Sequence, residues 1–258
     1  MSVNLKRSLI AIIYANIAFG CGGGNMVVAE GPIELLVSGQ SNAISGTNGQ
    51  MPFYSVTGHV LVNDFNCEWA TGEATCYGGM DMVVPTKEHA IHSNQTWILL
   101  GDELYKRTGR DVYIYTVARG GSHTSDFIRD NDWLSLFKNT LSVKPNICAN
   151  LWIQGESEKG YATQDTYANM RMLIDASRSV HPSLTWFVAL DAYAREAQQQ
   201  LIAEGIVRQG VDIDLLRATP SFFDKSLIEF LNDGHRAHAL AWIDILEPQI
   251  QQGMCRRQ

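Results

Sequence analysis

The sequence predicts an α/β fold, a three-layer α/β/α sandwich with a mainly parallel central sheet. Short apolar runs that predict buried strands alternate along the chain with longer segments of helical period. Strands that alternate with helices pair in parallel, and their helices cover both faces of the sheet. The chain has 258 residues, of which 45% are hydrophobic and 18% charged, which is enough for one sizeable core. Because the candidate site segments spread over the whole length, we expect a single domain over residues 31–252.

Each expected element follows from a local pattern. The helix that ends before Gly109 has a residue suited to a C-cap, and residues 163–180 carry Tyr167, Met170 and Leu173 at the spacing of a core-facing helical stripe. Residues 46–92 lack a helical pattern, and we expect a long insertion beside the site there. The expected strands are 33–37, 58–65, 112–118, 147–153 and 184–190, and the expected helices are 94–108, 133–141, 163–180, 194–208 and 237–250.

The N-terminal segment predicts export. Lys6 and Arg7 precede an apolar stretch over residues 8–20, the plan of a secretory signal peptide, and this stretch is too short to span a bilayer. The small residues before Cys21 resemble a bacterial lipobox, so we expect a lipid anchor at Cys21 and a flexible tether over residues 21–30. A plain cleaved signal with an incidental cysteine is the alternative. The expected location is periplasmic, or attached to the outer membrane as a lipoprotein.

Charge and cysteine content narrow the class of partner. Without residues 1–20, which carry two basic and no acidic residues, the formal net charge becomes −9, which argues against nucleic acid and anionic membranes as partners. We expect Cys67 and Cys76 to form a disulfide, and Cys148 to be a free buried thiol. No metal-ligand spacing is present, since His89 and His92 lack a third ligand nearby. We therefore expect neither a metal nor another cofactor.

One serine occupies the position of a nucleophile. Ser41 directly follows the apolar run 33–37, and open α/β sheets place their ligand sites at the carboxyl ends of the strands. A helix beginning there offers backbone N–H groups to a developing negative charge. An N-cap or turn role for Ser41 is the alternative. Three further polar segments at element junctions favour a site: Gly120-Gly121-Ser122, Gln154-Gly155-Glu156 and Asp233-Gly234-His235.

These segments resemble the motif blocks of the SGNH hydrolase superfamily, and within it the sialate O-acetylesterase-like and family-six carbohydrate esterases. The blocks are Gly39 to Asn42, Gly120 to Ser122 and Trp152 to Ser157, the last with Ile153 where the family has histidine. The resemblance covers about residues 33–246. It implies an SGNH/flavodoxin-like sheet and a serine esterase that removes O-acetyl groups from a carbohydrate.

The last motif block departs from the family pattern. An ungapped alignment on Gly234 and His238 places the family's catalytic Asp and His on Ser226 and Glu229. Glutamate is able to act as a base, but serine cannot orient it as aspartate orients histidine. We therefore expect a local rearrangement in which His235 is the base and Asp233 orients it. His238 is a second candidate, and a purely structural role for both histidines is the alternative.

The resemblance also implies an oxyanion hole and a substrate. The expected donors are the Ser41 N–H, a backbone N–H from Gly120 or Gly121, and the Gln154 side chain, with Glu156 stiffening the loop. An acetylated carbohydrate is the expected partner. Two alternatives follow from the altered block: a degenerate relative that binds acetylated glycans without cleaving them, and an esterase for other acyl esters.

Overall fold

A computed structural model describes residues 30–46, 49–63, 66–70, 73–77 and 82–256, with the backbone alone described for residues 66–70 and 73–77. The predicted signal peptide, the lipid-anchor cysteine Cys21 and nearly all of the tether lie outside these residues. In the described part of the chain, no helix combines the length and apolar character needed to cross a membrane.

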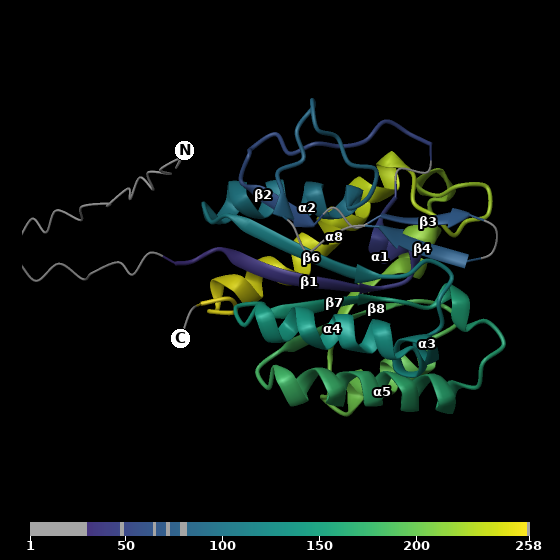
Figure 1. Ribbon diagram of the computed structural model, residues 1–258. Coiled ribbons are helices and arrows are strands. Elements are labelled where there is room, and N and C mark those ends of the chain that lie inside the picture. The colour runs from purple at the N-terminus through teal and green to yellow at the C-terminus, as the bar shows by residue number, and fades with distance from the viewer. Residues whose placement is uncertain (1–29, 47–48, 64–65, 71–72, 78–81, 257–258) are drawn as a thin grey trace, which may run out of the picture.

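The centre of the molecule is a seven-stranded sheet in the order β5-β2-β6-β1-β7-β8-β9 (Figure 1). All neighbouring strands run parallel except β2 and β5, which are antiparallel. This arrangement confirms the predicted mainly parallel α/β sheet. Its strands are β1 (Ile33–Gly39), β2 (Val60–Asn63), β5 (Met82–Val83), β6 (Val112–Ala118), β7 (Ala149–Ile153), β8 (Thr185–Leu190) and β9 (Arg208–Asp212).

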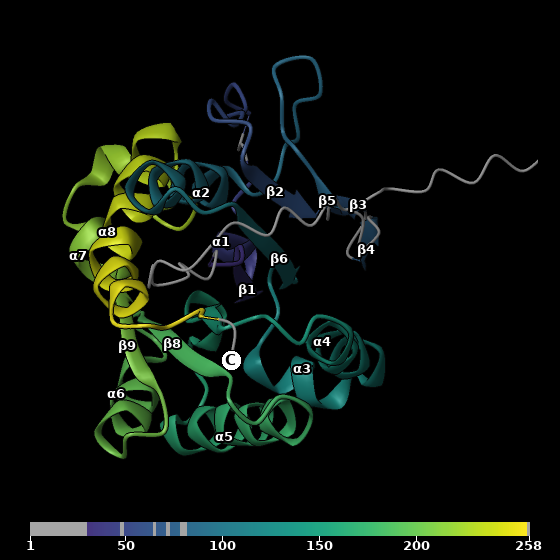
Figure 2. The same cartoon turned by 90° about the vertical axis from the view of Figure 1, so that its left-hand side faces the viewer.

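Helices cover both faces of the sheet (Figure 2). Helices α2 and α8 pack together on one side, and α3, α4, α5 and α6 form the layer on the other side. The helices are α1 (Ser41–Ile44), α2 (Gln95–Thr108), α3 (Thr124–Arg129), α4 (Asn131–Val143), α5 (Thr163–Val180), α6 (Arg195–Ala203), α7 (Ile213–Arg217) and α8 (Asn232–Gln251), with short 3-10 turns η1 (Glu156–Glu158) and η2 (Pro220–Phe222).

Two apolar cores lie on the two faces of the sheet. Successive side chains of a strand point to opposite faces, and β1 follows this rule. Leu35 and Val37 join Trp97 and Trp242 in the core under α2 and α8. Leu36, between them, joins the other core under α4 and α5. Because both faces of β1 are buried, all seven of its residues are shielded from solvent, and its carboxyl end is a fixed point for a site.

Several expected boundaries are wrong. Helix α6 ends at Ala203 rather than 208, since the chain turns at Gly205 with φ +68° and then forms edge strand β9. Helix α8 begins at Asn232 rather than 237, so Asp233 and His235 lie inside its first turn. Residues 46–92 do contain the expected insertion, and it carries β2, β5 and a separate hairpin of β3 (Asn66–Ala70) and β4 (Glu73–Tyr77).

The cysteine predictions have different outcomes. Cys148 is not a free thiol, because it forms a disulfide with Cys255 across a sequence separation of 107 residues. Cys148 immediately precedes β7, so this disulfide ties the C-terminal tail to the amino end of the sheet. Cys67 and Cys76 lie opposite each other in the backbone pairing of β3 and β4, but their side chains are outside the described residues.

Candidate active site

The nucleophile turn comprises residues 39–42 at the carboxyl end of β1. Ser41 is partly exposed and is the first residue of α1. Gly39 adopts φ +131°, and a Cβ atom there would collide with the Ile153 carbonyl of β7. Glycine therefore allows the turn to pass close to β7 before presenting the serine. The neighbouring turn at Gly120 and Gly121 lies beside it, because the Arg119 N–H donates to the Gly39 carbonyl over 2.9 Å.

The base loop, residues 224–229, brings an acidic side chain to Ser41. The Ser41 hydroxyl lies beside the carboxylate of Glu229, which is partly buried. Burial raises the pKa of Glu229, the neighbouring Ser41 side chain lowers it, and the nearby Asp224 charge raises it again; the net direction is upward. Glu229 is thus a carboxylate with increased basicity in contact with the candidate nucleophile.

The base loop is folded around Asp224. One carboxylate oxygen of Asp224 accepts the backbone N–H groups of Ser226, Ile228 and Glu229 at 3.1, 3.3 and 3.4 Å. Partial burial acts to raise the pKa of Asp224, but these hydrogen bonds and that of the Ser226 hydroxyl outweigh it and lower the pKa. Asp224 therefore stays ionised and holds the turn that ends at Glu229.

The structure does not bring His235 to Ser41. The His235 Nε2 atom donates to the Gly46 carbonyl over 3.0 Å, while Nδ1 faces the hydroxyls of Thr96 and Ser45 at 2.9 and 3.2 Å. Both ring nitrogens are therefore occupied, and burial lowers the pKa of His235 to about 4. The geometry gives His235 a structural role inside the first turn of α8.

Asp233 and His238 also do not have the contacts that their predicted catalytic roles require. Asp233 lies in the same helical turn as His235, but in the described structure its carboxylate accepts no hydrogen bond from the His235 ring. His238 is fully buried, and its Nε2 accepts from the Trp242 indole N–H over 2.9 Å. Burial, together with the nearby His235, lowers the pKa of His238 to about 3. We assign His238 to the core.

The Gln154 side chain braces the glycine turn. It is fully buried, and its Nε2 donates to the Ser122 carbonyl over 2.8 Å and to Glu158 over 3.0 Å. These two bonds use both amide hydrogens, so in this conformation Gln154 presents no donor to an oxyanion. The backbone N–H groups of Ser41 and Gly120 remain the candidate donors, and no acceptor among the described residues engages them.

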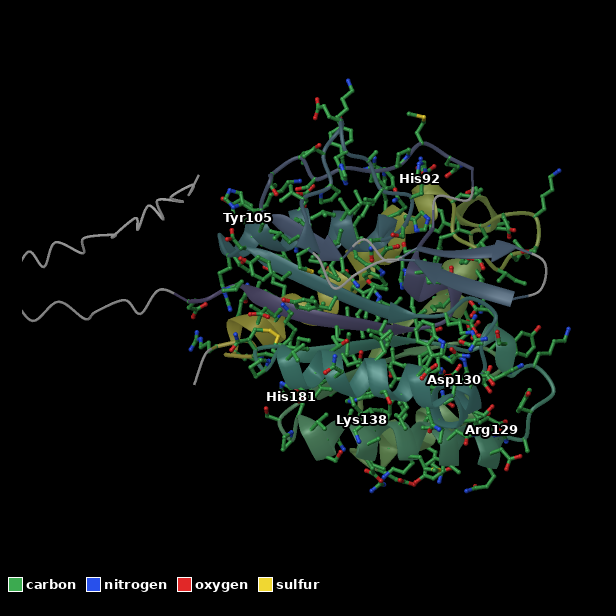
Figure 3. All side chains as sticks on the ribbon, in the orientation of Figure 1. His92, Tyr105, Arg129, Asp130, Lys138 and His181 are labelled. Atoms are coloured by element: carbon green, nitrogen blue, oxygen red, sulfur yellow. A yellow bond between two sulfur atoms is a disulfide. The ribbon has the colours of Figure 1, made fainter. Side chains whose placement is uncertain are left out.

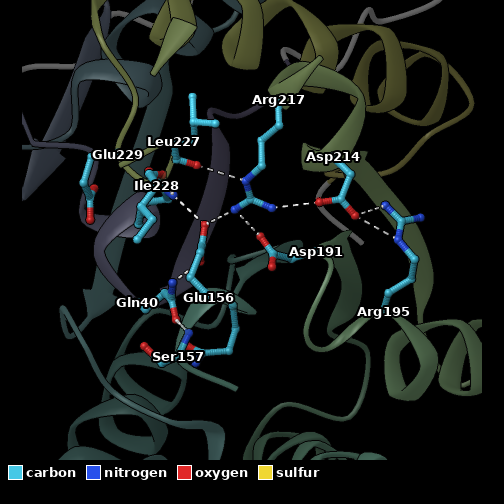
Figure 4. Close-up of polar contacts among 12 residues, drawn as sticks. Gln40, Glu156, Ser157, Asp191, Arg195, Asp214, Arg217, Leu227, Ile228 and Glu229 are labelled. Atoms are coloured by element: carbon cyan, nitrogen blue, oxygen red, sulfur yellow. Dashed lines mark hydrogen bonds and ion pairs between the residues drawn. The ribbon is translucent and has the colours of Figure 1, made fainter. Parts of the chain in front are cut away.

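Glu156 connects the residues on either side of the nucleophile. Its carboxyl accepts from the side chains of Gln40 and of Asn42, the latter over 2.8 Å, and pairs with Arg217 over 2.7 Å. Figure 4 shows the Arg217 guanidinium between the carboxyls of Glu156, Asp191 and Asp214. Glu156 is thus tied to both neighbours of Ser41, in keeping with the loop-stiffening role expected for it.

Glu156 and Asp191 are two buried carboxyls that meet at Arg217. Burial, reinforced by the Asp191 charge and opposed by Arg217, raises the pKa of Glu156 to about 8. Burial also raises the pKa of Asp191, and Arg217 opposes this rise. Arg217 pairs with both carboxyls over 2.7 Å and so stabilises their ionised forms.

Metal binding has no support in the described residues. No group of three or more His, Cys, Asp and Glu side chains is arranged to hold an ion in this part of the chain. His92 and His181 lie on opposite sides of the sheet (Figure 3).

Comparison with known proteins identifies the fold. No family model and no curated protein sequence matches the chain. A carbohydrate acetylesterase from Xanthomonas citri superposes with a TM-score of 0.57 and 16% identity, over 84% of this chain and 56% of that protein. The esterase EstA from Pseudoalteromonas sp. gives 0.54 and 10%, over 84% and 98%. A lipase/acylhydrolase from Enterococcus faecalis gives 0.51 and 12%, over 84% and 96%.

The chain therefore shares its α/β fold with these esterases and with the lipase/acylhydrolase. At these identities the likeness establishes the fold alone. The chain spans little more than half the length of the Xanthomonas acetylesterase.

Sequence reasoning undervalued two residues of this site. The ungapped alignment placed Glu229 in the position of the family histidine, and the structure puts Glu229 against Ser41. Arg217 was not considered, because a lone arginine after the segment Ile213-Asp214-Leu215-Leu216 has no motif around it. The role of Arg217 becomes visible only in the folded structure, because its hydrogen-bond partners come from three separate loops.

Proposed function

We propose that this protein is a serine esterase that removes O-acetyl groups from carbohydrate, with Ser41 as nucleophile and Glu229 as general base. The observation that carries the proposal is the placement of the Glu229 carboxylate beside the Ser41 hydroxyl at the carboxyl end of the sheet. A nucleophile within hydrogen-bond reach of a base is the geometry that covalent catalysis requires.

The reaction follows from this pair. Glu229 accepts the Ser41 proton as Oγ attacks the acetyl carbonyl, and the N–H groups of Ser41 and Gly120 stabilise the oxyanion. Protonated Glu229 then gives its proton to the departing sugar hydroxyl, leaving acetyl-Ser41. Glu229 next deprotonates a water that attacks this ester. The second oxyanion collapses with cleavage of the bond to Ser41 Oγ, Glu229 returns its proton to that oxygen, and acetate is released.

The choice of an acetylated carbohydrate as substrate has two supports. They are the likeness to a carbohydrate acetylesterase and the Trp152 to Glu156 block, which resembles the sugar esterases rather than the lipases. The acidic net charge disfavours polyanionic substrates.

The test is acetate release from a panel of acetylated glycans and a general acetyl ester, with wild type and Ser41→Ala compared. We expect release by wild type and loss of at least ~10³-fold in the variant, the scale on which removal of a triad nucleophile acts. Equal release by both proteins would refute the serine mechanism.

A glycan-binding protein without turnover is the second candidate. It is favoured by one observation, the use of both Gln154 amide hydrogens inside the protein. This candidate predicts calorimetric binding of an acetylated glycan by wild type together with no acetate release. Turnover of any ester in the panel that depends on Ser41 would eliminate it.

We also propose that the protein is exported and anchored through a lipid on Cys21. The Cys148–Cys255 disulfide supports an oxidising compartment. Incorporation of radiolabelled palmitate into wild type but not into Cys21→Ser would be expected, and absence of label from both would refute the anchor.

A further inference from the structure

We propose that Arg217 is a positioning residue that holds the base loop against the nucleophile turn and so sets the contact between Glu229 and Ser41. The inference rests on the proposed serine esterase function. Arg217 is the last residue of α7, and its side chain is 18% exposed. It reaches toward both halves of the site at once (Figure 4).

One half of the connection runs to the nucleophile turn. The Arg217 Nη2 atom donates to Glu156 over 2.7 Å. Glu156 in turn holds the side chains of Gln40 and Asn42, the two residues that flank Ser41. Displacement of Arg217 would therefore be felt on both sides of the nucleophile.

The other half runs to the base loop. The Arg217 Nε atom donates to the Leu227 carbonyl over 3.3 Å, and Asn42 Nδ2 donates to the Ile228 carbonyl over 2.8 Å. These carbonyls belong to the two residues immediately before Glu229. Arg217 and the Glu156–Asn42 pair thus close a hydrogen-bonded ring that passes through both segments and contains no direct contact with Glu229 itself.

The base loop needs this support because its backbone is strained. Leu227 adopts φ +59°, a left-handed conformation that a branched apolar residue rarely takes. The loop carries four consecutive exposed residues, from Lys225 to Ile228, so apolar burial does little to fix it. Hydrogen bonds to Asp224 on one side and Arg217 on the other supply the restraint.

Arginine suits this position for a geometric reason. Its planar fork offers five N–H donors, and here they serve Leu227, Glu156, Asp191 and Asp214. A lysine ammonium keeps the charge but, as a compact group at the end of a flexible stem, cannot serve these separated acceptors together. We therefore expect charge alone to be insufficient.

The test is a double-mutant cycle on turnover of p-nitrophenyl acetate. Arg217→Met in the wild-type background should lower kcat ~10²-fold, the effect of a displacement on the order of 1 Å at a reacting group, while KM changes less than about threefold, since Arg217 does not touch substrate. In the Glu229→Gln background, where the base is already absent, the same substitution should change kcat less than threefold. An unchanged ~10²-fold effect in that background would overturn the positioning role.

Two further variants keep the test decisive. Arg195→Met is the matched control, because Arg195 shares the Asp214 partner and pairs with Asp212 but contacts neither the base loop nor the nucleophile turn; its kcat should stay within about threefold of wild type. If Arg217→Met does not fold, Arg217→Lys takes its place in the cycle, with a loss of ~10-fold or more expected because the fork is missing. Wild-type-like kcat in folded Arg217→Lys would overturn the claim.

The outcomes separate this inference from the function on which it rests. A wild type without Ser41-dependent turnover would fail the proposed esterase. If wild type shows such turnover but the Arg217 substitution lowers kcat by the same factor with and without Glu229, only the inference about Arg217 is refuted.

Discussion

At the scale of single residues, the glutamate base that we propose at position 229 changes the charge balance of a serine esterase. A histidine base becomes a cation when it takes the serine proton, and an aspartate beside it stabilises that cation. A glutamate base starts as an anion and becomes neutral, so no cation needs a partner. A carboxylate at position 226 would instead raise the Glu229 pKa further by repulsion. Ser226 and Glu229, which together look like a broken motif, are therefore consistent as a pair.

The Glu229 environment predicts the pH dependence of the reaction. Only the ionised carboxylate accepts the Ser41 proton. On the acid side of the profile, kcat/KM should therefore increase with pH and level off above the Glu229 pKa. Since burial and Asp224 raise that pKa, the midpoint should lie above about 4.3, the unperturbed glutamate value. A pH–rate profile measures this midpoint, and Glu229→Gln should abolish the increase of kcat/KM with pH. If the increase persists in Glu229→Gln, another group is responsible for it.

At the scale of the elements, prediction from sequence succeeded where one pattern dominated. Strand β6 and helix α5 have the predicted bounds, because a fully apolar run and an unbroken helical stripe admit one interpretation. Strand β9 was missed because Arg208, Gln209 and Asp212 make it polar, and its place at the sheet edge tolerates this. Helix α8 begins earlier than expected, since Asn232, Asp233 and Gly234 resemble a loop but occupy its first turn.

The candidate site was predictable to the same extent. Strand ends located Ser41 and the Gly120 turn, since position along a parallel sheet follows from the chain alone. The base and its supports depend on which side chains meet across loops, as Glu229 and Arg217 do. A histidine beside a familiar motif was therefore preferred over a glutamate, although His235 uses both ring nitrogens inside the fold.

The buried histidines of α8 predict a loss of stability in acid. Burial lowers the pKa of His235 from 6.5 to about 4, so the unfolded chain binds more protons than the folded protein between these values. The free energy of unfolding should therefore fall as pH drops from 6.5 to 4, by about 3 kcal/mol from this residue. Urea titrations at several pH values measure the slope. His235→Gln should reduce it, and an identical slope in the variant would contradict the assignment.

At the scale of the whole molecule, the candidate active site and the disulfide lie at opposite ends of the sheet. Ser41 follows the carboxyl end of β1, whereas the Cys148–Cys255 disulfide joins the C-terminal tail to the chain just before β7. In Figure 1, α1 and the C-terminal end of the chain lie at opposite ends of the sheet. Arg110 reinforces that end by donating to the carbonyls of Gly31 and Cys255. The tail is thereby fixed to the first strand of the fold, away from the reaction.

This separation predicts that the disulfide affects stability but not catalysis. Its loop spans 107 residues, and loss of a native disulfide typically costs about 2–5 kcal/mol. The Cys148→Ser/Cys255→Ser protein should unfold at lower urea concentration than wild type, while kcat at 25 °C stays within about twofold. A large loss of kcat in protein shown to be folded by circular dichroism would place the disulfide within the machinery of the site.

The identity of the base is the central claim, and one comparison tests it most directly. Acetate release from a general acetyl ester should be measured for wild type, Glu229→Gln and His235→Gln, each confirmed to be folded. We predict that Glu229→Gln lowers kcat by ~10²–10⁴-fold, the contribution of general acid–base catalysis, and that His235→Gln retains kcat within about threefold. Wild-type turnover in Glu229→Gln, with loss in His235→Gln, would contradict the account and return the base to histidine.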